Sequence, residues 1–364
     1  MTAPVRKLKT AVNGLWRCFV RFWKANWLHK AAVILVAAIL FLTGCMYGVA
    51  QWYVWTQSDK SYDFGASFIP DYSKYLGLDP HANYLAMLND LGVKHLRLVS
   101  YWSDVEATKG TYDFSELDWE FQQAAAHGAK ISLAIGLRQP RWPECHAPDW
   151  VNTEPKLVWE PQLLQYIRAV VNRYQTSPAL DSYQLENEYY LKEFGTCTDF
   201  STARLTTEYN LVKQLDPHHP LIITRSNNII GWGINPPIPD EYGMSLYLRV
   251  WSTPINRYLE YPFPDWYYSF MAGMEKIATG KDTFIHELEM EPWVPDGQSI
   301  LTTSLAEQNK TMNPERFKYT LAFAERTGMK PVYLWGTEYW YYRMTVLHQP
   351  DLWNAAKQVF HSDK

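Results

Sequence analysis

The sequence predicts a (β/α)8 TIM barrel preceded by a single N-terminal transmembrane helix. Two observations lead to this fold class. A basic segment is followed by an apolar run long enough to cross a membrane, and eight short β-rich runs then alternate with amphipathic helical segments. Parallel strands need helical crossovers, and such a sheet closes naturally at eight strands. An open doubly wound sheet is the rival architecture, because alternation alone does not prove closure.

The N-terminal segment has the charge pattern of a membrane anchor. Residues 1–30 contain seven Lys or Arg and no Asp or Glu, and residues 31–54 are apolar apart from Thr43 and Gln51. About 20 apolar residues cross the hydrocarbon core, and the positive-inside bias leaves the basic end in the cytoplasm. We therefore expect a single-pass protein of the cell membrane, with residues 57–364 as one extracytoplasmic domain.

Two other interpretations of this segment remain open. One is a cleaved secretory signal. The other is a lipoprotein signal, because "LTGC" at 42–45 resembles a lipobox whose Cys45 would be lipidated after cleavage. The uncleaved anchor is favoured because the apolar run continues beyond Cys45 and ends in Trp52, Tyr53 and Trp55, aromatics typical of a membrane interface. All three interpretations export the domain.

Composition narrows the possible ligands. The chain has 364 residues, 47% apolar and 16% aromatic with 17 Trp, which suits surfaces that stack on flat ligands such as sugar rings. Without the seven basic residues of the first 30, the formal net charge falls from −4 to −11. Nucleic acid requires a basic footprint and is not expected as a partner. Nothing in the sequence indicates the oligomeric state.

The alternation of strands and helices covers the exported domain without repeats or linkers. One connection is weak, because "SNNIIGWGINPPIPDE" at 226–241 is too rich in Pro and Gly to form a long helix. Asp79, Ser115 and Asn313 are expected N-caps. The strands are expected at 62–68, 95–100, 130–136, 180–186, 220–225, 242–247, 283–289 and 331–336, and the main helices at 79–91, 115–127, 161–174, 202–215, 266–278, 314–327 and 351–360.

Two glutamates lie where a barrel enzyme carries its chemistry. Active-site residues of such barrels sit at the carboxyl ends of strands. Glu188 follows the fourth predicted strand, within "LENEYYL", and Glu287 ends the apolar run "TFIH" of the seventh. The sequence here resembles the clan A retaining glycoside hydrolases, barrel enzymes with an Asn-Glu acid/base at the end of strand four and a nucleophilic Glu at the end of strand seven.

Further landmarks carry the resemblance from about Tyr62 to Trp335. An Arg follows strand two in that clan, and Arg97 stands in "HLRLVS". The strand-six Tyr of the clan matches Tyr247 in "YGMSLYLRV", and its strand-eight Trp matches Trp335 in "YLWGTEYW". Five landmarks on five strands in the expected order make chance an unconvincing explanation.

The resemblance implies a role for each of these residues. Retaining cleavage needs one carboxylic acid to protonate the leaving oxygen and one carboxylate to attack the anomeric carbon, roughly 5 Å apart. Glu188 would be the acid/base, with its pKa raised by the charge of Glu287, the nucleophile. Asn187 would bind the sugar 2-hydroxyl. Arg97 and Tyr247 would orient Glu287, and Trp335 would form the floor of the subsite for the cleaved sugar.

Other acidic residues compete for these roles. Glu289 is the rival nucleophile, because strand residues two apart point the same way. By the same alternation, Glu186 is expected to share the side of Glu188, one layer deeper, as a partner behind the active site. Glu193 in "KEFG" imitates a nucleophile motif, but it lies five residues after Glu188 in one loop and is expected to be solvated. Glu291 is expected in the loop beyond the strand.

The loops after strands three and four supply the remaining candidates. Cys145 and Cys197 are candidates for one disulfide in an oxidising compartment, although two free thiols remain possible. A bridge would fix the loops that carry Trp142 and His146. No metal-ligand spacing, phosphate loop or nucleophile elbow is present, so no cofactor is expected. The candidate substrate-binding residues are Arg97, Trp102, Trp142, His146, Asn187, Tyr247, Trp293 and Trp335.

These observations predict a membrane-anchored, extracytoplasmic retaining glycosidase that acts on a β-linked oligo- or polysaccharide. Two alternatives stay open at this point. One is a non-catalytic glycan-binding or cell-envelope barrel protein. The other is a barrel enzyme of different chemistry that uses Glu188 as a lone base. β-Galactoside, β-mannoside, β-glucan and bacterial envelope glycan are all compatible substrates, because specificity depends on loop shape.

Overall fold

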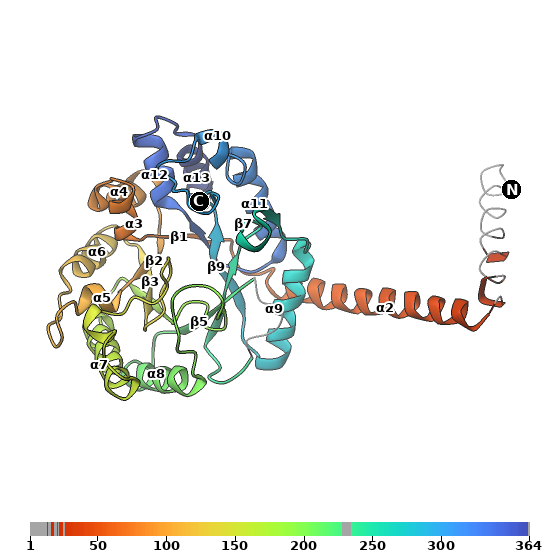
Figure 1. Ribbon diagram of the computed structural model, residues 1–364, viewed down its shortest axis with the longest axis horizontal. Helices are drawn as coiled ribbons and strands as arrows, with labels where there is room; N and C mark the ends of the chain where they lie inside the picture. The colour runs from red at the N-terminus through yellow and green to blue at the C-terminus, as the bar shows by residue number, and fades with distance from the viewer. Residues whose placement is uncertain are drawn as a thin grey trace.

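The computed structural model describes residues 26–227 and 234–362, together with 13, 16, 17, 20 and 22–24. Most of the expected cytoplasmic segment, 1–30, lies outside the described residues, as does 228–233 of the weak connection. The domain that follows the N-terminal helix is a barrel surrounded by helices (Figure 1).

Eight parallel strands close into the predicted barrel, in the order β1-β10-β9-β6-β5-β4-β3-β2. The closed order confirms the TIM barrel and excludes the open sheet. Each strand matches one of the predicted β-runs. Their bounds are β1 Phe64–Ser67, β2 His95–Val99, β3 Lys130–Ile135, β4 Leu180–Leu185, β5 Leu221–Ser226, β6 Glu241–Leu246, β9 Thr283–Glu289 and β10 Val332–Trp335.

Helices cover the outside of the barrel and connect successive strands (Figure 1). Asp79 and Asn313 cap their helices as predicted, whereas α6 begins at Ser115 with no side-chain cap. The bounds are α3 Pro70–Tyr75, α4 Pro80–Ala86, η1 Met87–Leu91, α5 Trp102–Val105, α6 Ser115–Ala126, η2 Asp149–Val151, α7 Lys156–Tyr174, α8 Thr202–Leu215, η3 Thr253–Ile255, α9 Asp265–Thr279, α10 Leu305–Gln308, α11 Pro314–Thr327, α12 Thr337–Thr345 and α13 Asp351–Ser362.

One hairpin was not predicted. β7, Arg249–Ser252, pairs antiparallel with β8, Arg257–Glu260, in the connection between β6 and α9. The short runs on either side of Pro254 have no hydrophobic periodicity, so the sequence does not predict this hairpin. Between β5 and β6, the described residues 234–240 contain no helix, in agreement with the composition of that segment.

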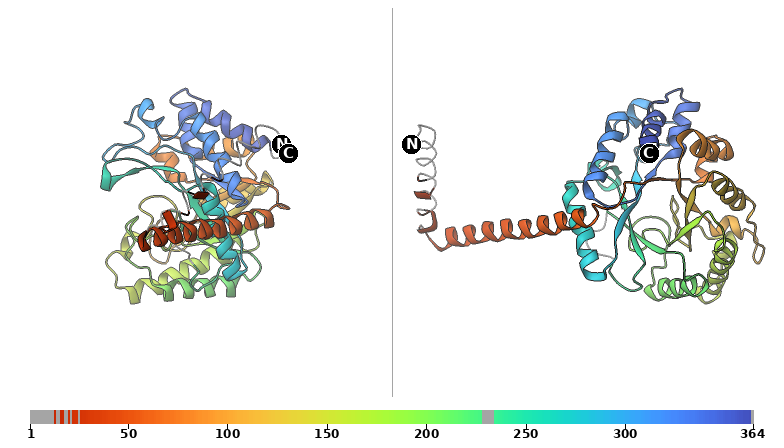
Figure 2. Two further views of the ribbon diagram at one scale, coloured as in Figure 1. Left: turned by 90° about the vertical axis from the view of Figure 1, so that its right-hand side faces the viewer. Right: turned by 180° about the vertical axis from the view of Figure 1, so that it is seen from behind.

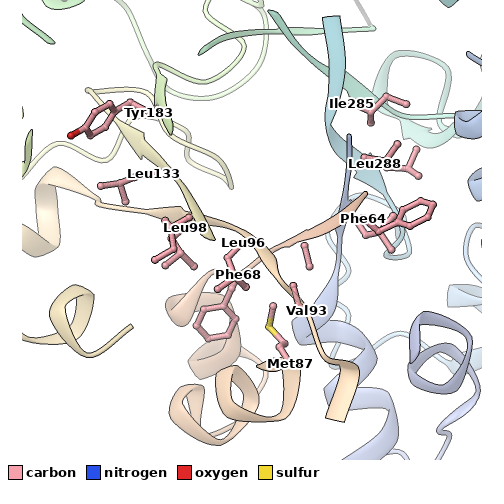
Figure 3. Packing of buried hydrophobic residues seen from close by; sticks show 14 of the residues in the cluster. Phe64, Phe68, Met87, Val93, Leu96, Leu98, Leu133, Tyr183, Ile285 and Leu288 are labelled. Atoms are coloured by element: carbon pink, nitrogen blue, oxygen red, sulfur yellow. The ribbon is translucent and has the colours of Figure 1, made fainter. Parts of the chain in front are cut away.

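Strand alternation divides the core into two parts. Leu96 and Leu98 of β2 belong to the large apolar cluster between the strands and the helices, together with Met87 (Figure 3). The residue between them, Arg97, is fully buried and faces the barrel interior, where it bonds Gln184 of β4. Because side chains alternate along a strand, Arg97 of β2 points into the barrel interior, whereas Leu96 and Leu98 point outward to the helices.

The N-terminal helix α2, Trp27–Thr56, leaves the barrel beside α9 and projects away from it on the side opposite α7 (Figure 1). It is long and apolar enough to cross a membrane. Its last turns, however, pack against the barrel, because Ala50 and Tyr53 are fully buried. The apolar run 31–54 thus contains two kinds of surface, one exposed along the free part of the helix and one packed against protein.

Candidate active site

A cleft of about 660 Å³ opens at the carboxyl ends of the strands. It brings together most of the residues singled out from the sequence, although they lie far apart along the chain. Its polar and aromatic lining includes Tyr72, Arg141, Trp142, Glu144, His146, Tyr247, Glu287, Glu289, Trp293 and Trp335.

Glu287 is held from two sides. Arg97 donates from Nη1 to one carboxylate oxygen, and the Tyr247 hydroxyl donates to the other. Arg97 is itself fixed, because its Nε lies 2.7 Å from Gln184 Oε1 and its Nη2 lies 2.9 Å from Asn187 Oδ1. A carboxylate that accepts charge-assisted hydrogen bonds from fixed donors is stabilised in its ionised form and in one orientation.

Glu188 occupies a different environment. Burial, and then the nearby charge of Glu287, raise the pKa of Glu188 to about 7. Its side-chain Oε1 is buried and accepts no hydrogen bond of good geometry among the described residues, whereas the hydroxyls of Ser245 and Ser226 near the carboxyl partly oppose the rise in pKa. Its backbone N–H donates to Thr224 Oγ1 over 2.8 Å, which fixes the main chain at a φ of 42°. This carboxyl is therefore suited to hold a proton near neutral pH.

Asn187 links Arg97, which holds Glu287, to a further carboxyl group, that of Glu144. Its Oδ1 accepts from Arg97, and its Nδ2 donates to Glu144 Oε2 over 2.9 Å. Sequence reasoning missed Glu144. Burial raises the pKa of Glu144 to about 8, even though the Arg138 guanidinium lies 3.3 Å away and opposes the shift. The only signal for Glu144 was its position beside Cys145 in a loop after strand three.

Glu186 does not follow the strand alternation that the sequence suggested. β4 ends at Leu185, and the φ of 56° at Glu186 turns the chain out of the strand. The Glu186 carboxylate accepts from the backbone N–H of Leu137 over 2.7 Å and from Arg204 over 2.9 Å. It therefore joins the loop after β3 to helix α8 behind the site, and the expectation that it shares one side of strand four with Glu188 is wrong.

Glu289 lines the cleft but has other partners. It accepts from Trp293 Nε1 over 2.9 Å and from the Glu291 backbone N–H over 2.8 Å. Burial and the charge of Glu291 raise its pKa well above the usual range for a carboxyl. Of Glu287 and Glu289 in β9, Glu287 is the one that accepts hydrogen bonds from Arg97 and Tyr247.

Trp335 forms part of the cleft wall and is 4% exposed. The guanidinium of Arg141 lies 4.4 Å from its ring centroid and 3.6 Å from that of Tyr72. Arg141 also contacts Glu291 through two nitrogens at 2.6 and 3.3 Å. Arg141 was not singled out from the sequence, because an Arg in an irregular loop has no recognisable pattern.

The predicted disulfide between Cys145 and Cys197 is present and joins the loops after β3 and β4. Trp142 lines the cleft and is 61% exposed, so its ring is available to a ligand. His146 stacks on Tyr101 with ring centroids 3.5 Å apart, and burial lowers its pKa to about 4, so it is neutral at pH 7. Glu193 is exposed, as expected.

One substrate-binding candidate is wrong. Trp102 is fully buried at the start of α5, where its Nε1 donates to Glu106 Oε2 over 2.7 Å. Its ring packs against Trp150 and Tyr166 in the large apolar cluster. Sequence position placed it just after strand two, near the cleft, but the first turn of α5 directs the side chain into the core.

Comparison with protein-family models and with curated proteins gives no match. Among solved structures, the chain resembles a β-galactosidase from the Antarctic haloarchaeon Halorubrum lacusprofundi, with 13% identity and a TM-score of 0.53 over 83% of this chain and 58% of that one. The GH5_18 protein from Bifidobacterium longum subsp. longum, solved in complex with Manb1-4GlcNAc, has 11% identity and a TM-score of 0.54, over 75% of this chain and 68% of that one.

A β-galactosidase from the psychrophilic Marinomonas ef1 has 12% identity and a TM-score of 0.53, over 82% of this chain and 59% of that one. The chain thus spans less than two thirds of the length of both β-galactosidases. At this level of identity the likeness shows the barrel fold. The function has to be argued from the residues in the cleft.

Proposed function

We propose that this protein is a retaining glycosidase that hydrolyses β-linked glycans by double displacement. The observation that carries the proposal is the contrast between two neighbouring carboxyl groups. Glu287 is held by Arg97 and Tyr247, and Glu188 is buried with its pKa raised to about 7. One ionised nucleophile beside one protonated acid is the arrangement that retaining cleavage requires.

The reaction follows from these two states. Glu188 donates its proton to the glycosidic oxygen while Glu287 attacks the anomeric carbon, so that the bond to the leaving group breaks and a glycosyl ester forms. The ester removes the negative charge of Glu287, and the pKa of Glu188 falls. Glu188 then takes a proton from water, the hydroxide attacks the anomeric carbon, and Glu287 is released as a carboxylate.

Asn187 is assigned to the sugar 2-hydroxyl, Trp335 to the wall of the cleaved-sugar subsite, and Trp142, Trp293 and His146 to flanking subsites. All of these side chains except Asn187 line the cleft, and Asn187 bonds both Arg97 and Glu144 beside it. The presence of both carboxyl groups speaks against a barrel that only binds glycans.

We also propose that α2 anchors the enzyme in the cell membrane with its barrel outside the cytoplasm. The support is the length and apolar character of the helix, with the basic residues before it; Tyr53, expected at the membrane interface, packs against the barrel instead. Flotation of the protein with membranes after a high-salt wash, and protease access to the barrel from outside intact cells, test this proposal.

Activity is tested with a panel of 4-nitrophenyl glycosides, on the wild type and on Glu287→Gly and Glu289→Gly. We expect one or more β-glycosides to be cleaved. Azide should restore activity to Glu287→Gly as a glycosyl azide of inverted configuration, and should restore none to Glu289→Gly. Rescue of Glu289→Gly in place of Glu287→Gly reassigns the nucleophile, and a panel without any turnover contradicts the proposal.

A further inference from the structure

The packing of α2 on the barrel fixes the direction from which the helix arrives. In the C-terminal third of α2, Tyr47 contacts Trp266 in the first turn of α9, with ring centroids 5.9 Å apart. Farther along, a Cβ placed on Gly273 of α9 would lie only 2.9 Å from Val49 Cγ1. At the end, Gln57 donates to Asp282 Oδ1 over 2.8 Å, just beyond α9. The contacts therefore follow the same order along both helices, although α2 crosses α9 at a steep angle (Figure 1 and Figure 2).

The direction of α9 in turn identifies the two ends of the barrel. α9 connects β6 to β9, which are parallel neighbours, so it must run from the carboxyl end of one strand to the amino end of the other. Tyr53, near the end of α2, lies at the amino end of the strands, because its hydroxyl donates to the carbonyl of Thr283, the first residue of β9, over 2.6 Å. Since α2 contacts the start of α9 before it reaches Thr283, its free N-terminal part lies toward the carboxyl ends of the strands, where the cleft opens.

The arrangement can be followed in the left panel of Figure 2. The N-terminal end of α2 and the β7–β8 hairpin, which belongs to the carboxyl-end loops, extend toward the same side of the barrel.

The length of the free part leaves no spacer between membrane and barrel. The 16 residues 31–46 lie between the basic segment and Tyr47, and none of them is buried. At 1.5 Å per residue they span about 24 Å, which is no more than the roughly 30 Å of the hydrocarbon core. The next residue, Tyr47, already touches the barrel, so the rim of the barrel near α9 lies at the level of the lipid head groups.

We infer that the catalytic cleft opens on the membrane side of the barrel, and that the substrate is a glycan carried on a lipid of the same membrane. The inference rests on the proposed glycosidase activity and on the proposed anchoring. A rigid helix holds the cleft close to the bilayer surface and facing it obliquely. A glycan whose reducing end is attached to a membrane lipid enters such a cleft directly, whereas a soluble polymer approaches it through the narrow space between barrel and lipid.

The orientation is tested on the full chain in lipid nanodiscs, with one fluorophore on a single cysteine in a background of Cys18→Ser and Cys45→Ser. Ile255→Cys places the label on the exposed tip of the β7–β8 hairpin, and Ala126→Cys places it on the exposed end of α6 at the opposite end of the barrel. Lipids with a spin-labelled head group should quench the label at 255 several-fold more than the label at 126. Equal quenching, or stronger quenching at 126, overturns the inference.

Two further variants test whether docking sets the orientation. Gly273→Leu inserts a side chain between α9 and Val49, and Ala278→Leu adds the same side chain at an exposed position of the same helix. Gly273→Leu should lose the difference in quenching and keep full turnover of the soluble aryl glycoside, and Ala278→Leu should keep both. A difference that survives in Gly273→Leu shows that docking does not orient the barrel and contradicts the inference.

The substrate class is tested with the sugar that the aryl-glycoside panel identifies, presented as its hexadecyl glycoside in vesicles. Cleavage should be several-fold faster when enzyme and glycoside share a vesicle than when they are in separate vesicles, and Gly273→Leu should reduce that advantage. If the aryl glycoside is cleaved but the shared vesicle gives no advantage, the inference is overturned and the proposed function stands. If no aryl glycoside is cleaved, the proposed function fails, and the quenching experiment still decides the orientation.

Discussion

The ends of β4 and β9 carry the same functional group in opposite settings. At the end of β9, Glu287 has a cation on one oxygen and a phenol on the other. At the end of β4, Glu188 has a buried oxygen that accepts no hydrogen bond of good geometry among the described residues, and a pKa of about 7. Neighbouring groups, and not residue type, therefore give these two carboxyl groups the separate properties that the proposed nucleophile and proton donor require. Five measurements test this difference.

The largest effect is expected for Glu287→Gln, which keeps the shape of the side chain and removes both the nucleophile and its charge. We expect kcat on an aryl glycoside to fall by about 10⁴-fold or more, because no covalent intermediate can form. Thermal unfolding should show that the variant remains folded. Retention of wild-type kcat contradicts the assignment of the nucleophile.

Glu188→Gln removes the proton donor but leaves the nucleophile in place. We expect kcat to fall by about 10²–10⁴-fold for a poor leaving group, the range for loss of a general acid. The first step should be affected far less with 2,4-dinitrophenyl glycosides, whose leaving group needs no proton. Equal losses for both leaving groups contradict the role of Glu188 as acid.

Tyr247→Phe removes one of the two donors to Glu287. A hydrogen bond to a charged group contributes about 1.5–3 kcal/mol, so kcat should fall by roughly 10–100-fold, with a smaller change in KM. Tyr342→Phe is a matched control, because this buried tyrosine lies outside the cleft. Steady-state kinetics of both variants check the prediction, and losses of equal size show that the effect is not local to Glu287.

The pH profile reports the state of Glu188. Its pKa is raised, so the proton is present below about pH 7 and is lost as the pH rises through that value. We expect kcat/KM to decrease above pH 7 and to approach a tenfold loss per pH unit. Glu188→Gln should remove this alkaline limb from the profile of a 4-nitrophenyl substrate, whose leaving group benefits from the proton. A limb that persists unchanged in that variant assigns the titration to another group.

The smallest effect is expected for Trp142→Ala. The ring is 61% exposed and contacts Phe194 at its edge, so its loss should leave stability nearly unchanged. KM for an oligosaccharide should rise several-fold, in line with about 1 kcal/mol of aromatic stacking. Trp102→Ala provides the contrast, since removal of a buried Trp costs about 3–5 kcal/mol of unfolding free energy. An unchanged KM removes Trp142 from the subsites.

The two tryptophans also show where sequence reasoning reached its limit. Both were placed in the cleft because they follow β2 and β3, whose carboxyl ends lead to it. Strand position predicts the end of the barrel at which a residue lies, but not the direction of its side chain, which depends on the first turn after the strand. For Trp102 that turn belongs to α5 and leads into the core.

Glu144 and Arg141 were missed for a related reason. Both lie in an irregular loop with positive φ, of 71° and 85°, closed by the disulfide between Cys145 and Cys197. Periodicity gives no information on such a loop, because its side-chain directions depend on contacts with other loops. The bonds of Glu144 to Asn187 and of Arg141 to Glu291 appear only when the ends of β3, β4 and β9 are brought together.

The eight strands, their alternation with helices and an N-terminal helix apolar enough to span a membrane follow from the sequence, because local periodicity and composition encode these features. Only the folded chain shows that the strands close into a barrel, that Cys145 pairs with Cys197, that Glu186 turns away from the cleft, and that α2 packs across α9. These contacts join residues far apart along the chain, and their geometry depends on how the whole barrel closes.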